Sequence, residues 1–205
     1  MKLFGTPGSP YVRKVRVVLE EKRIPYEYVI TSPATREAVV GPLNPLAKIP
    51  TLERDDGSAL YDSPVIVEYL DGLVAAPRLI PQAFADRIEV RRWEALGDGI
   101  ADATVLISHD YRKPAALRES ADWYAKQTLK IERGLAVINK ELGDREYCFG
   151  ASFTLADIAA GYALGYLDYA WREIEWRKPF PALDRLAARL AARESFRKTV
   201  QSQAA

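Results

Sequence analysis

Residues 9–14 read Ser-Pro-Tyr-Val-Arg-Lys and follow a short apolar strand at Lys2–Gly5. Serine is a preferred helix N-cap, and proline suits the first helical position because its missing N–H is not needed there. Apolar residues then recur with helical spacing, at Val12, Val15, Val18 and Leu19. The stretch predicts a helix over Pro10–Lys22 that holds the Ser9 hydroxyl beside the free N–H of Val12. Such a helix end is a site for an anion.

A second Ser-Pro pair, Ser63-Pro64, precedes another segment with one apolar face. It predicts a helix over Pro64–Leu73 with Ser63 at its cap. Two helix ends of this kind in the first third of the chain favour a small ligand with more than one negative group.

The first 77 residues alternate strand-like and helix-like segments. Besides Lys2–Gly5, strands are expected at Tyr26–Ile30, Pro50–Glu53 and Ala59–Tyr61, and a short helix near Thr35–Val40. The order βαβ-α-ββα implies a mixed four-stranded sheet with helices on both faces, as in a thioredoxin-like domain. We therefore assign residues 1–77 to an α/β domain of this kind.

Beyond a linker at residues 75–81 the pattern is helical throughout. Helices are expected over Asp86–Tyr111, with possible weak points at its glycines, and over residues 120–142. Thr154 and Asp157 form a capping box ahead of a third helix that ends near Ala170, and a further helix follows Pro181. Residues 85–205 are therefore predicted to be an all-α domain, a helical bundle.

The composition is that of an ordinary globular chain and excludes several functions. The 205 residues are 48% hydrophobic and carry 29 basic against 28 acidic side chains, which leaves no basic surface for nucleic acid. The single cysteine, Cys148, excludes an intrachain disulfide and a Cys-x-x-Cys redox or zinc motif, and we expect no metal. No stretch approaches the ~18 apolar residues of a membrane span, so we expect a cytoplasmic protein without membrane contact.

Two further segments carry candidate binding groups. Residues 44–51 read Asn-Pro-Leu-Ala-Lys-Ile-Pro-Thr, and a cis Ile49–Pro50 bond would turn the Ile49 backbone groups outward toward an extended peptide. Lys48 beside it could meet a carboxylate. Asp62-Ser63 combines an acceptor for an ammonium with a helix end for a carboxylate, as an amino-acid head group requires. Each segment also has a purely structural interpretation, as a rigid loop and as a helix cap.

Together these segments resemble the cytosolic glutathione transferases, particularly the bacterial serine-type and theta-like members. Residues 9–15 are similar to the thiolate-activating segment of that family, residues 44–50 to its cis-proline loop, and Asp62-Ser63 to its acid-serine pair for the γ-glutamyl group. Residues 193–196 resemble its closing segment. The chain departs from the pattern at Ala47, where glycine is usual, and at Asp62, where a longer side chain is common. Serine rather than cysteine at residue 9 argues against the thiol-reductase branch.

The resemblance implies that glutathione thiolate is added to an electrophilic, partly apolar small molecule. Glutathione is then a cosubstrate, no other cofactor is needed, and the protein is a homodimer. Ser9 would be the catalytic residue, and the glutathione site would comprise Ser9, Val12, Lys48, Ile49, Pro50, Asp62 and Ser63. Two alternatives remain open: a glutathione-binding or protein-interaction module without turnover, and a glutathione-dependent peroxidase.

Candidates for a second-substrate pocket are Tyr11, His109, Tyr111 and Tyr166. A tyrosine stripe is more often part of a helix core than of a pocket. His109, the only histidine, shares a helical face with Asp98 and Asp102, which is more typical of a solvated or interface surface. With one histidine and no Gly-x-Ser-x-Gly elbow, Ser9 is not an acyl nucleophile.

Overall fold

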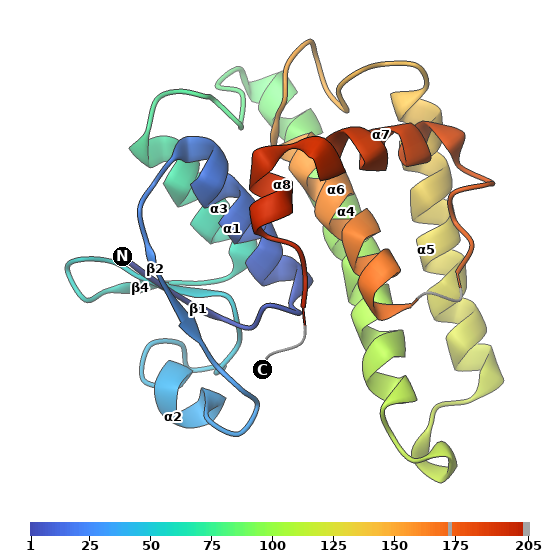
Figure 1. Cartoon of the computed structure of the whole chain (residues 1–205), viewed down its shortest axis with the longest axis horizontal. Helices are drawn as coiled ribbons and strands as arrows, with labels where there is room; N and C mark the ends of the chain where they lie inside the picture. The colour runs from blue at the N-terminus through green and yellow to red at the C-terminus, as the bar shows by residue number, and fades with distance from the viewer. Residues whose placement is uncertain (172–173, 203–205) are drawn as a thin grey trace. The chain divides into compact units, whose positions relative to one another are not determined.

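The computed structural model describes residues 1–171 and 174–202 (Figure 1). By their contacts these residues form two compact units, one of Met1–Ile80 with the chain from Arg193 onward, and one of Pro81–Ala192. The predicted division at residues 77 and 85 placed the C-terminal residues in the helical part. By their contacts, the described residues from Arg193 to Ser202 group with the first unit instead.

The sheet of the first unit has four strands in the order β2-β1-β3-β4. They are β1 (Lys2–Gly5), β2 (Glu27–Ile30), β3 (Thr51–Glu53) and β4 (Ala59–Leu60). The β1 strand is parallel to β2 and antiparallel to β3, and β3 is antiparallel to β4. This mixed sheet confirms the predicted thioredoxin-like fold. The predicted third strand began at Pro50, one residue too early, since proline has no N–H to give to the ladder.

Four helices complete this unit: α1 (Pro10–Lys22), α2 (Arg36–Val40), α3 (Ser63–Leu73) and α8 (Glu194–Lys198). The α1 and α3 helices lie side by side on one face of the sheet, and α2 lies on the other (Figure 1). The apolar face expected for α1 is buried, with Val12, Val15 and Leu19 all at 0% exposure.

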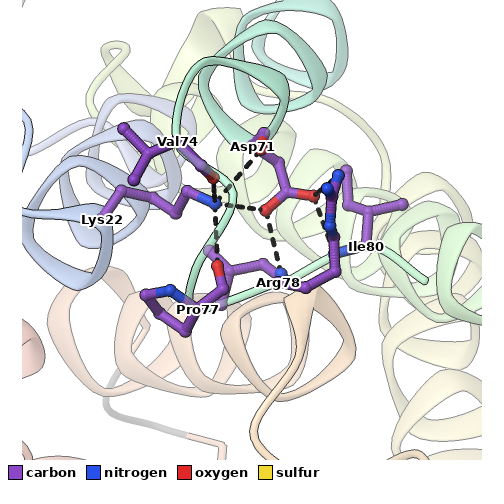
Figure 2. Close-up of polar contacts among 7 residues, drawn as sticks. Lys22, Asp71, Val74, Pro77, Arg78 and Ile80 are labelled. Atoms are coloured by element: carbon purple, nitrogen blue, oxygen red, sulfur yellow. Dashed lines mark hydrogen bonds and ion pairs between the residues drawn. The ribbon is translucent and has the colours of Figure 1, made fainter. Parts of the chain in front are cut away.

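A buried ion pair joins the last residue of α1 to the last turn of α3 (Figure 2). Lys22 Nζ donates to Asp71 Oδ1 at 2.8 Å and to the Asp71 carbonyl at 3.2 Å. The segment that follows α3 supplies the remaining partners: the carbonyls of Val74 and Pro77 accept from Lys22, and the N–H groups of Leu79 and Ile80 donate to Asp71. Because the C-terminal ends of two neighbouring helices meet here, α1 and α3 run in the same direction.

The second unit is helical, as predicted. Its elements are α4 (Phe84–Tyr111), the 3-10 turn η1 (Ala115–Leu117), α5 (Ala121–Leu142), α6 (Leu155–Ala170) and α7 (Pro181–Ala192). The predicted capping box at Thr154 and Asp157 is present. None of the helices in the described residues is long and apolar enough to span a membrane.

Gly97 does not weaken α4, which runs unbroken through it. A Cβ at Gly97 would stand 2.7 Å from the Ala159 carbonyl oxygen of α6. The glycine therefore lets the two helices approach closely, a packing role that helical periodicity does not distinguish from a weak point.

Candidate functional site

Ser9 is the N-cap of α1, and its Oγ accepts a hydrogen bond from the Val12 N–H at 3.3 Å. The Ser9 N–H is bonded to the Thr6 carbonyl at 3.1 Å, so the residue is fixed from both sides. A hydroxyl has one donor and two acceptor sites, and the cap uses only an acceptor. The Ser9 O–H therefore remains able to donate to an anion while the helix stays capped.

Val12 is a core residue. Its side chain is 0% exposed, and a Cβ at Gly5 would stand 2.6 Å from Val12 Cγ2. Its N–H, expected to be free beside the Ser9 hydroxyl, is instead engaged in the cap. Sequence patterns do not show which of the first N–H groups a capping serine will take.

The Ile49–Pro50 peptide is cis, as predicted. The antiparallel register of β1 and β3 pairs Phe4 with Thr51, and continuing it places Pro50 across from Gly5. The cis-proline loop therefore ends beside the C-terminal end of β1, from which the chain passes through residues 6–8 to Ser9.

Asn44 holds this loop in shape from within. Its side-chain N–H groups donate to the Lys48 carbonyl at 3.1 Å and to Thr51 Oγ1 at 3.2 Å, and Thr51 Oγ1 donates to the same carbonyl at 2.8 Å. The Lys48 side chain is exposed, so its backbone is fixed while its ammonium is available to an anion. Ala47 has a positive φ of 47°, a conformation that glycine adopts more easily. It is also the position at which the sequence has alanine where glycine is usual.

Asp62, rather than Ser63, caps α3, one residue before the predicted cap. The Asp62 carboxylate accepts from the Ser63 N–H, and the Asp62 carbonyl accepts from the Ile66 N–H at 3.0 Å. Ser63 is the first helical residue and is 1% exposed. Both residues are good caps, so the sequence alone does not separate them.

The fold of the first unit brings three predicted segments to one end. Because α1 and α3 are neighbours that run in the same direction, Ser9 and Asp62 lie at the same end of the helix pair. The cis bond before Pro50 lies at the C-terminal end of β1, the end that leads to Ser9. Two helix N-termini and an exposed lysine make this end favourable to anionic groups.

The candidates for the second-substrate pocket have different surroundings. Tyr11 belongs to the first unit, and His109 is exposed near the C-terminal end of α4. The ring centroid of Tyr111 lies 5.1 Å from that of Tyr124, and Tyr111 is 41% exposed. Tyr166 is 2% exposed, and burial raises the pKa of its hydroxyl. Tyr166 is thus a core residue of the second unit, and the shared pocket stays a prediction.

Cys148 lies apart from these residues, in the second unit. Burial raises the pKa of its thiol well above the usual range, and its N–H donates to Asp157 Oδ1 at 2.8 Å. A neutral, enclosed thiol of this kind is a structural group. Within the described residues, no group of three or more His, Cys, Asp or Glu side chains is placed to hold a metal ion.

Among the polar contacts of α1 that sequence reasoning missed, one lies close to Ser9 in the sequence. Arg13, one turn after Ser9, donates from Nη1 to Gln201 Oε1 at 2.8 Å, and the bond is buried. The two residues are 188 positions apart in the chain, and no local pattern marks such a pair.

Comparison with known proteins agrees with this architecture. Residues 3–78 match the family described as "Glutathione S-transferase, N-terminal domain", and residues 121–189 match "Glutathione S-transferase, C-terminal domain". The GST-like protein YibF of Escherichia coli K12 is 37% identical over 199 residues, which cover 97% of this chain and 98% of that protein.

Solved structures are also similar along nearly the whole chain. The crystal structure of a glutathione S-transferase from Methylobacillus flagellatus KT with GSH bound is 45% identical with a TM-score of 0.94. The match covers 98% of the present chain and 99% of the chain in that structure. A second glutathione S-transferase structure, from Methylobacterium radiotolerans in complex with glutathione sulfonate, is 42% identical with a TM-score of 0.92. This match covers 100% of the present chain and 96% of the chain in that structure. The chain therefore belongs to the glutathione S-transferase family.

Proposed function

We propose that this glutathione transferase adds the thiolate of glutathione to an electrophilic, partly apolar small molecule, and that the Ser9 hydroxyl stabilises the thiolate. The observation that carries the proposal is the geometry of the cap: the Ser9 oxygen accepts from Val12, which leaves its proton for a bound anion. Glutathione acts as a cosubstrate and brings the nucleophile itself.

The remaining predicted residues hold the rest of the tripeptide. The Ile49 backbone, beside the cis bond to Pro50, pairs with the extended peptide, and the Lys48 ammonium meets a carboxylate. Asp62 and the N-terminus of α3, which begins at Ser63, bind the α-ammonium and α-carboxylate of the γ-glutamyl group. The glutathione-bound relative from Methylobacillus flagellatus KT supports glutathione as the ligand.

The magnitudes fit this role. Lowering the pKa of a thiol from ~8.5 by about two units requires about 2.7 kcal/mol. A hydrogen bond to a charged group contributes about 1.5–3 kcal/mol, and the helix N-terminus adds about 0.3–1 kcal/mol. Ser9 and the helix dipole together are therefore sufficient to raise the thiolate fraction at neutral pH.

The Ser9→Ala variant tests the proposal. Removing the donor should raise the thiol pKa in the glutathione complex by about one to two units and lower kcat near neutral pH by about 10- to 100-fold. The apparent KM for glutathione should change little, and raising the pH should recover part of the rate. The measurement is a pH profile of kcat with 1-chloro-2,4-dinitrobenzene, together with an absorbance titration of the bound thiolate.

A matched control separates this effect from the loss of a helix cap. Ser120 caps α5 in the same way, with its Oγ accepting from the Trp123 N–H at 3.3 Å. Ser120→Ala should cost similar stability and leave the pH profile unchanged. If the pH profiles of wild type and Ser9→Ala superimpose, Ser9 is only a helix cap. If the protein is retained on immobilised glutathione but turns over no electrophile, it is a binding module rather than an enzyme.

We further propose that the protein is a homodimer, as the resemblance implies. Light scattering across micromolar concentrations should report a particle with the mass of two chains. A particle with the mass of one chain would contradict the dimer without affecting the assignment of Ser9.

A further inference from the structure

The C-terminal segment, defined here as Arg193–Gln201, is bonded to α1 near the end of that helix (Figure 1). The Arg193 guanidinium donates to both carboxylate oxygens of Glu21, at 2.6 and 2.7 Å. Lys198 Nζ lies 3.3 Å from Glu20 Oε2. Three helical turns of α1 separate these contacts from Ser9, and they anchor the segment on the helix.

The other end of the C-terminal segment reaches the first turns of α1. Arg13 is 8% exposed; its Nη1 donates to Gln201 Oε1 at 2.8 Å and its Nη2 to the Phe196 carbonyl at 3.4 Å. The guanidinium carbon also lies 5.4 Å from the centroid of the Phe196 ring. The segment therefore fixes the planar head of Arg13 from two directions.

A glutamine at position 201 stabilises the fold less than an apolar residue of similar volume would. It is 8% exposed, and its Nε2 is buried with no hydrogen-bond partner among the described residues. A buried donor left unpaired costs free energy, and an apolar residue of similar volume would avoid that cost. What Gln201 supplies is a single acceptor for Arg13.

Arg13 in turn holds Ser9 directly. The Arg13 N–H donates to the Ser9 carbonyl at 3.1 Å, in the first turn of the helix. One residue thus has its backbone bonded to Ser9 and its side chain bonded to the C-terminal segment. The position of the Ser9 hydroxyl follows from this turn, since the cap bond to Val12 lies within it.

We propose that Arg13 is a positioning residue for the transferase reaction and that Gln201 is the anchor that holds it. The inference rests on the proposed role of Ser9. The C-terminal segment, far from the glutathione-site residues in sequence, then sets how well the Ser9 hydroxyl is held for the thiolate. Arg13 acts through the helix turn, because its backbone N–H is bonded to the Ser9 carbonyl while its guanidinium is bonded to Gln201 and to the Phe196 carbonyl.

The experiment replaces the acceptor and keeps the volume. Gln201→Met should lower kcat at neutral pH by about tenfold and change the glutathione KM by less than about twofold, since a small displacement of a catalytic group acts mainly on the transition state. Amide hydrogen exchange of a peptide covering residues 10–15 should become faster. Gln201→Glu, which again offers an oxygen to Arg13, should restore both the rate and the protection from exchange.

Val200→Ala is the matched control, because Val200 is the neighbouring residue and is 61% exposed. It should leave both the exchange and the rate at the wild-type level. Wild-type exchange and wild-type kcat in Gln201→Met would overturn the proposal, as would a Gln201→Glu variant that behaves like Gln201→Met. If the wild-type protein turned over no electrophile, the proposed function would fail, while the exchange experiment would still report whether Gln201 holds the first turn.

Discussion

Lys22 Nζ and Asp71 Oδ1 lie 2.8 Å apart, and their side chains are 0% and 4% exposed. A buried ion pair is stable only when its remaining hydrogen-bonding groups are also satisfied. Here backbone carbonyls accept the other hydrogen bonds of the ammonium, and two N–H groups donate to the carboxylate, which also has the Arg78 guanidinium nearby (Figure 2). The pair therefore fixes both the ends of α1 and α3 and the path of the chain from Val74 to Ile80.

Lys22→Met should destabilise the protein by about 3 kcal/mol, because it leaves the buried Asp71 charge with two backbone donors and only the partly exposed Arg78 as a counter-charge. Arg78→Met is the control: its guanidinium lies 3.8 Å from Asp71 Oδ2 and is 39% exposed. That substitution should cost no more than about 1 kcal/mol, because the Arg78 head group is partly solvated and lies beyond hydrogen-bond distance of the carboxylate. Denaturant unfolding followed by circular dichroism measures both, and equal losses would show that burial is not what makes Lys22 important.

Ala47→Gly should stabilise the cis-proline loop. The φ of 47° at Ala47 costs an L-residue about 1–2 kcal/mol, and glycine adopts it freely at an entropic cost of about 0.5–1 kcal/mol. The net gain is about 0.5–1 kcal/mol. The same substitution at Ala38, an exposed residue within α2, should be destabilising instead. Unfolding midpoints of the two variants should therefore move in opposite directions.

Asp62→Ala and Ser63→Ala should raise the apparent KM for glutathione by about tenfold and change kcat little. Contacts to the γ-glutamyl head group are present equally in the ground state and the transition state, so they affect binding rather than the chemical step. Steady-state kinetics at varied glutathione gives both constants. An unchanged KM with a strongly lowered kcat would instead show that these residues act on the chemical step.

Asp110 should make stability sensitive to acid. The ammonium of Lys113, 2.7 Å from Asp110 Oδ1, and the Tyr124 hydroxyl lower the pKa of this carboxyl from 3.8 to about 2. The folded state then binds the proton more weakly than the unfolded state. The stabilisation is complete above the unfolded pKa and is lost as the pH falls from 3.8 toward about 2.

Lys113→Met should therefore flatten this acid limb, since it removes the main cause of the lowered pKa. Unfolding free energies measured at about pH 5 and about pH 3 should differ less in the variant than in the wild type. Lys126→Met, at an exposed lysine on α5, should keep the wild-type difference. If the difference in unfolding free energy between the two pH values were the same in the wild type and both variants, Asp110 would not determine the acid sensitivity of the protein.

Local signals in the sequence predicted the long helices because caps and apolar periodicity act within a few residues. The Ser9 cap and the Thr154 capping box were both placed correctly. The sequence did not show whether Asp62 or Ser63 caps α3, because the two residues are adjacent and both are good caps. The structure shows that Asp62 is the cap. The contact of Gln201 with Arg13 joins residues 188 positions apart and could not be predicted, since tertiary packing alone brings them together.

The first unit is assembled from two stretches of chain with Pro81–Ala192 between them. During synthesis, α1 is translated before Pro81–Ala192, and the C-terminal segment that accepts from Arg13 is translated after it. The nascent unit must therefore wait for the whole helical part to be translated before the Arg13 side chain finds Gln201. A fragment of residues 1–80 would carry the sheet and the proposed glutathione-site residues but would lack Gln201 as the acceptor for Arg13. Translation of the C-terminal segment, rather than completion of the sheet, is thus the step after which the Arg13 side chain can be held by Gln201.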